Sequence, residues 1–377
     1  MQFIDLNKQY QAIRVSVQQR IDAVLQHGQF IMGPEIMELE QRLASYVGCK
    51  YCISCSSGTD ALLLALMAHE VGPGDAIFTT TFTFIATAEV ICLLGATPIF
   101  VDIDQRTFNI DPGQLQKAVR DTQNGKNAAP GIPKNVRPRG IIAVDIFGLP
   151  SDYDAISQIA SEHGLFVVGD AAQSFGGMYK DRRVCSLAEI STTSFFPAKP
   201  LGCYGDGGAI MTDNEALAER MRSLRVHGKG ADKYDNVRIG INGRLDTLQA
   251  AILLAKLEVF DEEIASRQTV ARRYSEGIGD VVVVPHVPQA CRSAWAQYSV
   301  LSTRRATLTA KLKEVGVPTA VYYPKPLHLQ KAFSFLGYAE GIFPVAERVS
   351  DQIFSLPMHP YLEERDQDRI ITTIRTT

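Results

Sequence analysis

The sequence has no run of basic residues and no long apolar stretch. Its 377 residues include 38 Lys and Arg against 41 Asp and Glu, a formal net charge of −3. This balance provides no electrostatic footprint for nucleic acid, so no nucleic-acid partner is expected. The longest apolar stretch, around Val90–Val101, is broken by Gly95, Thr97 and Pro98. A membrane span needs roughly 18–20 apolar residues, so no membrane association is expected either.

The N-terminal segment also lacks the basic and apolar regions of a signal peptide, which predicts a cytoplasmic protein. Seven cysteines, an odd number in a large chain, favour free thiols over a disulfide framework. Cys49, Cys52 and Cys55 have the spacing of an iron–sulfur ligand run, but Thr59 stands where the bacterial pattern has its fourth cysteine. The main interpretation therefore includes no metal, with an iron–sulfur site as an alternative.

What the sequence does contain is an alternation of apolar strand-like runs with amphipathic helical runs over its first 250 residues, which indicates an α/β fold. Expected strands are Tyr51–Cys55, Ala76–Thr80, Thr97–Val101, Gly140–Val144, Leu165–Gly169, Ile190–Phe196 and Gly208–Met211. Expected helices are Asp60–His69, Phe84–Leu94, Asp111–Val119 and Asp152–Glu162. Such units pair mainly in parallel and give an open sheet covered by helices on both faces.

The length of the chain predicts about two domains. A long helical pattern over Arg244–Ser275 would link the sheet domain to a smaller C-terminal α/β unit. We therefore predict a large domain over residues 1–250 and a small domain over residues 251–377. The segment Asp121–Arg139 carries turn formers without periodicity and is expected to be a surface loop.

Lys199 is the only charged residue between Ile190 and Gly205, and it lies on a loop between Pro197 and Pro200. An amine in poorly hydrated surroundings has its charged form disfavoured and is a better nucleophile toward a carbonyl. The alternative is an ordinary solvated loop lysine. The residues around Lys199 favour the interpretation as a reactive lysine.

Asp170 follows the expected strand at Leu165–Gly169, on the sheet edge where ligands bind in open α/β folds. Taken alone it could equally be a helix cap. Together with an isolated lysine 29 residues later, it suggests pyridoxal 5′-phosphate (PLP), with Lys199 forming the Schiff base and Asp170 keeping the pyridine nitrogen protonated.

The segment from Ser56 to Asp60 is a turn of small residues that opens a helix, which favours a phosphate dianion. Its simpler interpretation is an N-cap. Ser194 could add a hydroxyl, and Phe84 is a candidate to stack on the cofactor ring or a core residue.

Motifs along nearly the whole chain resemble the DegT/DnrJ/EryC1/StrS sugar aminotransferases, PLP enzymes of fold type I with an aspartate aminotransferase-like architecture. They include Ser-Ser-Gly-Thr-Asp-Ala-Leu from Ser56, Asp-Ala-Ala-Gln-Ser-Phe-Gly from Asp170, Ser-Phe-Phe-Pro-Ala-Lys-Pro-Leu-Gly from Ser194, Asn-Gly-Arg-Leu-Asp from Asn242 and Ser-Leu-Pro-Met-His-Pro from Ser355. Each motif is weak alone, and jointly they are specific.

The resemblance implies catalytic roles for Lys199 and Asp170 and a position for Gln173 beside the phenolic oxygen of the cofactor. It also implies that the phosphate is held by Ser57, Gly58, Thr59 and Ser194. Asn242 would reach in from a second subunit, so that a homodimer with composite sites is expected. One branch of the group has histidine in place of the lysine and performs dehydration, and Lys199 argues against that branch.

The finer resemblance is to enzymes that aminate C3 of UDP-2-acetamido-2-deoxy-3-oxo-glucuronate with L-glutamate as donor, in the synthesis of O-antigen or capsule sugars. Arg244, Tyr322, Tyr323 and His328 are its candidate substrate-binding residues, and an arginine suits a sugar carboxylate. Tyr322 departs from the expected histidine, and Arg244 could instead belong to an interface or a helix start. The expected reaction is ping-pong transamination, with Lys199 as covalent anchor and then as general base and acid.

Two other functions stay open at this point. One is an aminotransferase for a different nucleotide-linked 3-keto or 4-keto (6-deoxy) sugar. The other is a non-catalytic PLP-binding regulator that has kept the fold.

Overall fold

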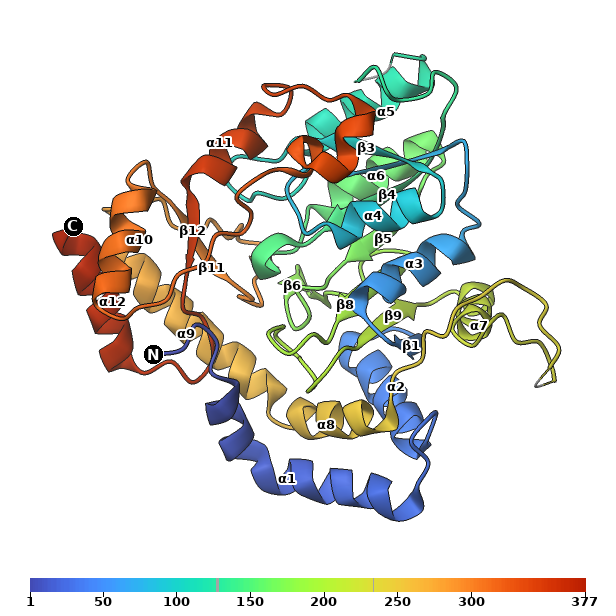
Figure 1. Ribbon diagram of the computed structural model, residues 1–377, viewed down its shortest axis with the longest axis horizontal. Coiled ribbons are helices and arrows are strands. Elements are labelled where there is room, and N and C mark those ends of the chain that lie inside the picture. The colour runs from blue at the N-terminus through green and yellow to red at the C-terminus, as the bar shows by residue number, and fades with distance from the viewer. Residues whose placement is uncertain (127–128, 233) are drawn as a thin grey trace.

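The fold centres on a seven-stranded sheet (Figure 1). The computed structural model describes residues 1–126, 129–232 and 234–377. The spatial order is β1-β9-β8-β5-β4-β2-β3. Their bounds are Tyr51–Cys55 (β1), Gly208–Thr212 (β9), Ile190–Ser194 (β8), Phe166–Asp170 (β5), Arg137–Val144 (β4), Asp75–Thr80 (β2) and Thr97–Val101 (β3). Only β9 runs in the direction opposite to the other strands of this sheet, which confirms the mainly parallel α/β architecture.

The strands alternate their side chains between two cores, one on each face of the sheet. On β4, Ile141 and Ala143 belong to the first core, while Ile142 belongs to the second. The second core is covered by α3 (Gly58–Ala68), α4 (Ala86–Leu93) and α7 (Glu215–Leu224). The first is covered by α2 (Pro34–Val47), α5 (Pro112–Gln123), α6 (Tyr153–His163) and α8 (Thr247–Leu257). The period of two along each strand explains why both faces are covered.

The segment Arg244–Ser275, predicted to be one long helical run, forms two helices. The prediction that the run is continuous was therefore wrong. It comprises α8, which packs against α1 (Leu6–His27), and α9 (Phe260–Ile278). Val259 leaves the helical region at φ −109° and ψ 2°. The first helix is apolar and almost wholly buried, whereas the second opens with three acidic residues in its first turn. Acidic side chains stabilise a helix N-terminus, so a new helix starts there.

The C-terminal chain forms a third core with α9. This core contains residues of α10 (Arg305–Glu314), α12 (Glu364–Thr376) and the antiparallel pair β11 (Tyr298–Leu301) and β12 (Ile353–Leu356). In Figure 1, α9 leads from α8 to these elements, which lie near both chain ends. In the chain between β11 and β12, three elements pack against the first core instead: η2 (Leu327–Leu329), η3 (Lys331–Leu336) and α11 (Pro344–Gln352). The division at residue 250 stays a prediction.

A small sheet joins β10 (Cys291–Arg292), β6 (Met178–Tyr179) and β7 (Arg182–Arg183). Within the expected loop at Asp121–Arg139, residues 127–128 lie outside the described residues, and Ala129, Ile132 and Val136 are buried. That segment is therefore not wholly a surface loop.

In the described parts of the chain, no helix combines the length and apolarity needed to cross a membrane.

Candidate functional site

A cavity of about 620 Å³ opens where several strands of the main sheet end. Asp170 is the last residue of β5 and Ser194 the last of β8, while Ser57 lies two residues after β1. The cavity is lined by ten of the predicted site residues: Ser57, Gly58, Thr59, Phe84, Asp170, Gln173, Ser194, Lys199, Tyr322 and Tyr323. The sheet edge thus gathers side chains that are distant in sequence, as expected for an open α/β sheet.

Lys199 lies in a tight turn after β8, where its backbone N–H donates to the Phe196 carbonyl over 2.8 Å. Burial lowers the pKa of its amine, and the negative charge of Asp170 partly opposes that shift. Removal from water therefore favours the neutral, nucleophilic amine.

Asp170 is buried, with 5% of its surface exposed. Its Oδ2 accepts from the Thr87 hydroxyl over 2.8 Å, and its Oδ1 accepts from the Ala172 N–H over 3.2 Å. Burial raises the pKa of this carboxyl, while the two hydrogen bonds and the Lys199 charge lower it. Sequence reasoning missed Thr87, although it lies only three residues after Phe84 in the same segment.

The start of α3 forms an anion cradle. Ser57 caps the helix by accepting from the Asp60 N–H over 3.0 Å. The first amides of a helix have no intrahelical acceptors and attract anions. A Cβ on Gly58 would lie 2.7 Å from the Ser194 Cβ, so only glycine lets β8 approach the helix this closely. These residues fit the phosphate group of PLP.

Gln173, which also lines the cavity, is held between two hydrogen-bond partners. Its Oε1 accepts from the Phe147 N–H over 2.5 Å, and its Nε2 donates to the Tyr323 hydroxyl over 3.2 Å. Because a backbone N–H can only donate, this contact orients the amide. Nearby, the Phe84 ring is 55% exposed and lies 6.5 Å from that of Tyr323. A flat ligand ring could therefore lie against the face of Phe84.

Three predicted residues do not line this cavity. Asn242 is exposed, and Arg244 is half-buried with an Nε that has no hydrogen-bond partner in the described part of the chain. His328 is buried, with Nδ1 2.7 Å from the Thr81 hydroxyl and Nε2 3.1 Å from a Glu347 carboxylate oxygen. The three assigned roles stay predictions.

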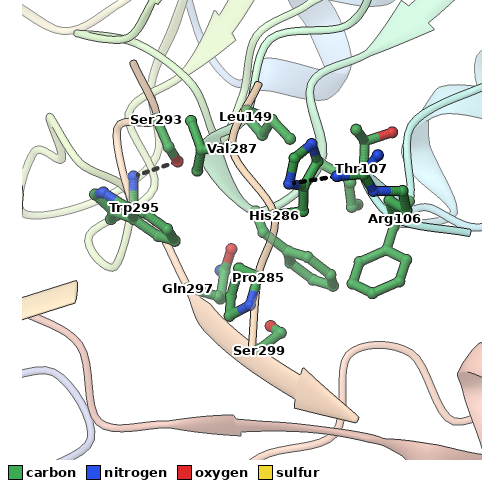
Figure 2. Close-up of a pocket in the computed structure, with 13 residues that line it drawn as sticks. Arg106, Thr107, Leu149, Pro285, His286, Val287, Ser293, Trp295, Gln297 and Ser299 are labelled. Atoms are coloured by element: carbon green, nitrogen blue, oxygen red, sulfur yellow. Dashed lines mark hydrogen bonds between the residues drawn. The ribbon is translucent and has the colours of Figure 1, made fainter. Parts of the chain in front are cut away.

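A smaller pocket adjoins the site (Figure 2), and Gln297 lines both. An Arg106 guanidinium nitrogen lies 3.1 Å from His286 Nδ1 across it, as the dashed line shows. None of the predicted site residues line it. Gln297 lies in a segment that carried no motif, so sequence reasoning had no signal for it.

The cysteine run does not converge on a site. Cys52 packs in the first core and Cys55 in the second, on opposite faces of β1. All seven cysteines are free. Among the residues that the structure describes, no group of three or more His, Cys, Asp or Glu could hold a metal ion. The strand period therefore argues against the iron–sulfur alternative.

Two curated relatives match nearly the whole chain. The UDP-2-acetamido-2-deoxy-3-oxo-D-glucuronate aminotransferase of Pseudomonas aeruginosa is 48% identical over 364 residues, 96% of each chain. A protein of Geobacillus stearothermophilus named pleiotropic regulatory protein is 42% identical over 375 residues, 98% of this chain and 96% of the relative.

Solved structures agree with these matches. A DegT/DnrJ/EryC1/StrS aminotransferase from Brucella abortus is 48% identical with a TM-score of 0.96, covering 100% of this chain and 99% of that one. NtdA from Bacillus subtilis, solved with bound cofactor PMP, is 30% identical with a TM-score of 0.88, covering 99% of this chain and 82% of that one. The sequence also matches the DegT/DnrJ/EryC1/StrS aminotransferase family over residues 11–375. This chain therefore belongs to the DegT/DnrJ/EryC1/StrS aminotransferase family.

Proposed function

We propose that the protein is a PLP-dependent aminotransferase that moves an amino group from L-glutamate to C3 of UDP-2-acetamido-2-deoxy-3-oxo-D-glucuronate. The observation that carries the proposal is that one cavity combines Lys199, Asp170 and the anion cradle of α3. These are the three groups that a phosphorylated pyridine aldehyde requires. The Pseudomonas relative, at 48% identity, supplies the substrate in this proposal.

Bound PLP supplies an electron sink for carbanion chemistry. The Lys199 amine would anchor it covalently, and the same amine would take the α-proton from the donor and return a proton to the acceptor. A lowered pKa suits both tasks, because the amine must be neutral to act as nucleophile or base. Asp170 would keep the ring nitrogen protonated, and Gln173 would lie beside the phenolic oxygen.

In the same proposal the acceptor sugar is bound by Arg244, Tyr322, Tyr323 and His328. The unpartnered Nε of Arg244 is consistent with a role for this guanidinium in binding the sugar carboxylate. Tyr322 and Tyr323 line the cavity, whereas His328 contacts Thr81 and does not line it.

The proposal includes a homodimer in which Asn242 and Arg244 complete the cavity of the partner copy. It is supported by their position outside the cavity of their own chain and by a row of exposed apolar side chains, Phe30, Ile31 and Met32. The corresponding cellular role is that of a cytoplasmic enzyme in the synthesis of surface polysaccharide sugars, such as those of O-antigen or lipopolysaccharide.

The test starts from purified protein loaded with PLP. L-glutamate should convert the visible absorption band of the lysine-bound cofactor to the amine form, and the UDP-3-oxo-uronate should restore it. The reaction can also be run backward, with the stable 3-amino sugar as amino donor and 2-oxoglutarate as acceptor. The C6-hydroxymethyl analogue is the matched control for the carboxylate. Equal rates with both sugars would move the assignment to another keto sugar.

A regulator remains a second candidate, because the Geobacillus relative carries a regulatory name. A protein that binds PLP but leaves its spectrum unchanged with glutamate and every keto sugar offered would favour this candidate.

A further inference from the structure

A second carboxylate, Asp145, lies in the wall of the same cavity. It directly follows β4, whose last residue, Val144, pairs with Asp170 in the sheet register. The Asp145 N–H donates to the Asp170 carbonyl over 3.1 Å, so the two residues are adjacent across the strand ends. Sequence reasoning assigned nothing to Asp145, and the proposed reaction does not use it.

Asp145 has no exposed surface. One carboxylate oxygen accepts from the Ser151 N–H over 2.8 Å, and the other lies 2.7 Å from the Ser174 hydroxyl. In the described part of the chain, no Lys, Arg or His lies within ion-pair distance of it. A buried carboxylate with three neutral hydrogen-bond partners, the Ser151 N–H, the Ser174 hydroxyl and the Tyr153 phenol, and with no cation is costly to keep ionised.

The groups that face Asp145 add no positive charge of their own. They are Asp170 from β5, the Tyr153 phenol from α6 and the thiols of Cys185 and Cys291. The basic side chain of the site, Lys199, interacts with Asp170 and not with Asp145. Burial raises the pKa of Asp145 to about 7, and the charge of Asp170 acts in the same direction. Two adjacent buried carboxylates next to one amine favour a single shared negative charge.

We propose that Asp145 holds a proton in the resting site, so that Asp170 carries the negative charge there alone. As a carboxylic acid, Asp145 donates to the Ser174 oxygen and still accepts from the Ser151 N–H, so both contacts survive protonation. Its role is then to position the loop after β4 while leaving one charge for Asp170. The consequence for a bound pyridine ring rests on the proposed function, but the proton itself does not.

The proposal is tested on the cofactor-free protein by urea unfolding from pH 5 to pH 8. Folded Asp145 binds its proton more tightly than the unfolded chain, whose aspartates have a pKa of about 4. The wild type should therefore lose stability as the pH rises toward 7. Relative to Asp145→Asn, its unfolding equilibrium constant should increase by up to about tenfold per pH unit in this window and level off above it. Asparagine mimics the protonated acid, because it donates to Ser174 and accepts from Ser151.

Ser174→Ala is the matched second variant. It removes a hydrogen bond that favours the ionised form, so the pH-dependent window should move upward, and this shift should vanish in the Asp145→Asn background. Parallel pH curves for the wild type and Asp145→Asn would overturn the proposal.

If Asp145→Asn does not fold, the infrared carbonyl stretch of the wild type decides. A protonated carboxyl band at pH 6 that disappears by pH 8 and that Asp170→Asn retains supports the proposal. Absence of the band at pH 6, or its loss in Asp170→Asn, overturns it. Neither measurement requires PLP, so a failure of the proposed function would be seen separately.

Discussion

Lys199 and Asp170 lie in surroundings that disfavour both of their charges, since burial lowers the pKa of the amine and raises that of the carboxyl. The charge of each group offsets part of the pKa shift of the other. At the scale of single residues, the chemistry of the site therefore depends on how little water reaches these two groups and on which hydrogen bonds replace it.

Lys199→Ala should reduce transamination by at least about 10³-fold, because it removes both the covalent anchor and the general base. The thermal midpoint of the cofactor-free variant should change little. Lys313→Ala, at an exposed position of α10, is the control and should retain full activity. Steady-state assays and circular dichroism melting give both values. Near-normal turnover by Lys199→Ala would refute the assigned role.

Thr87→Val should lower kcat/KM by roughly tenfold, since a hydrogen bond to a charged group contributes about 1.5–3 kcal/mol. The valine keeps the shape but removes the 2.8 Å donor to Asp170, which raises the pKa of that carboxyl further. Thr87→Ser should restore most of the rate. A valine variant as active as the wild type would show that Asp170 does not need this donor.

At the scale of elements, the approach of α3 to β8 determines the shape of the anion cradle. Gly58→Ala places a Cβ 2.7 Å from the Ser194 Cβ, so the helix and the strand must separate. We expect PLP affinity to fall roughly tenfold or more, because charge-assisted hydrogen bonds to the phosphate lengthen. Gly72→Ala, whose Cβ meets nothing within 4 Å, is the control. Absorbance titration of the cofactor-free proteins measures both, and equal affinities would contradict the cradle.

At the scale of the whole molecule, the composite site predicts complementation between two inactive variants. Lys199→Ala and Asn242→Asp homodimers should both be strongly impaired. If Asn242 acts across the interface, a mixed dimer has one intact site, so random reassociation should restore about a quarter of the wild-type sites. The assay is activity after unfolding and refolding the two variants together. No recovery would mean that Asn242 serves its own chain or no site at all.

Much of this protein could be read from its sequence alone. The strands Tyr51–Cys55 and Thr97–Val101 have the predicted bounds, because short apolar runs flanked by turn formers form buried strands. Ten site residues meet in one cavity because parallel strands end at a common edge, which places residues after different strands side by side.

Only the tertiary structure decided which distant elements meet. Local periodicity carries no signal for the helix break at Val259 or for the burial of Ala129 and Ile132. It also carries none for the position of Thr87, Asp145 and Gln297 in the cavity wall. Periodicity determines which face of an element is buried, whereas the identity of the element covering that face depends on packing across the whole chain. For the same reason, Asn242, Arg244 and His328 resembled site residues in sequence yet lie outside the cavity of their own chain.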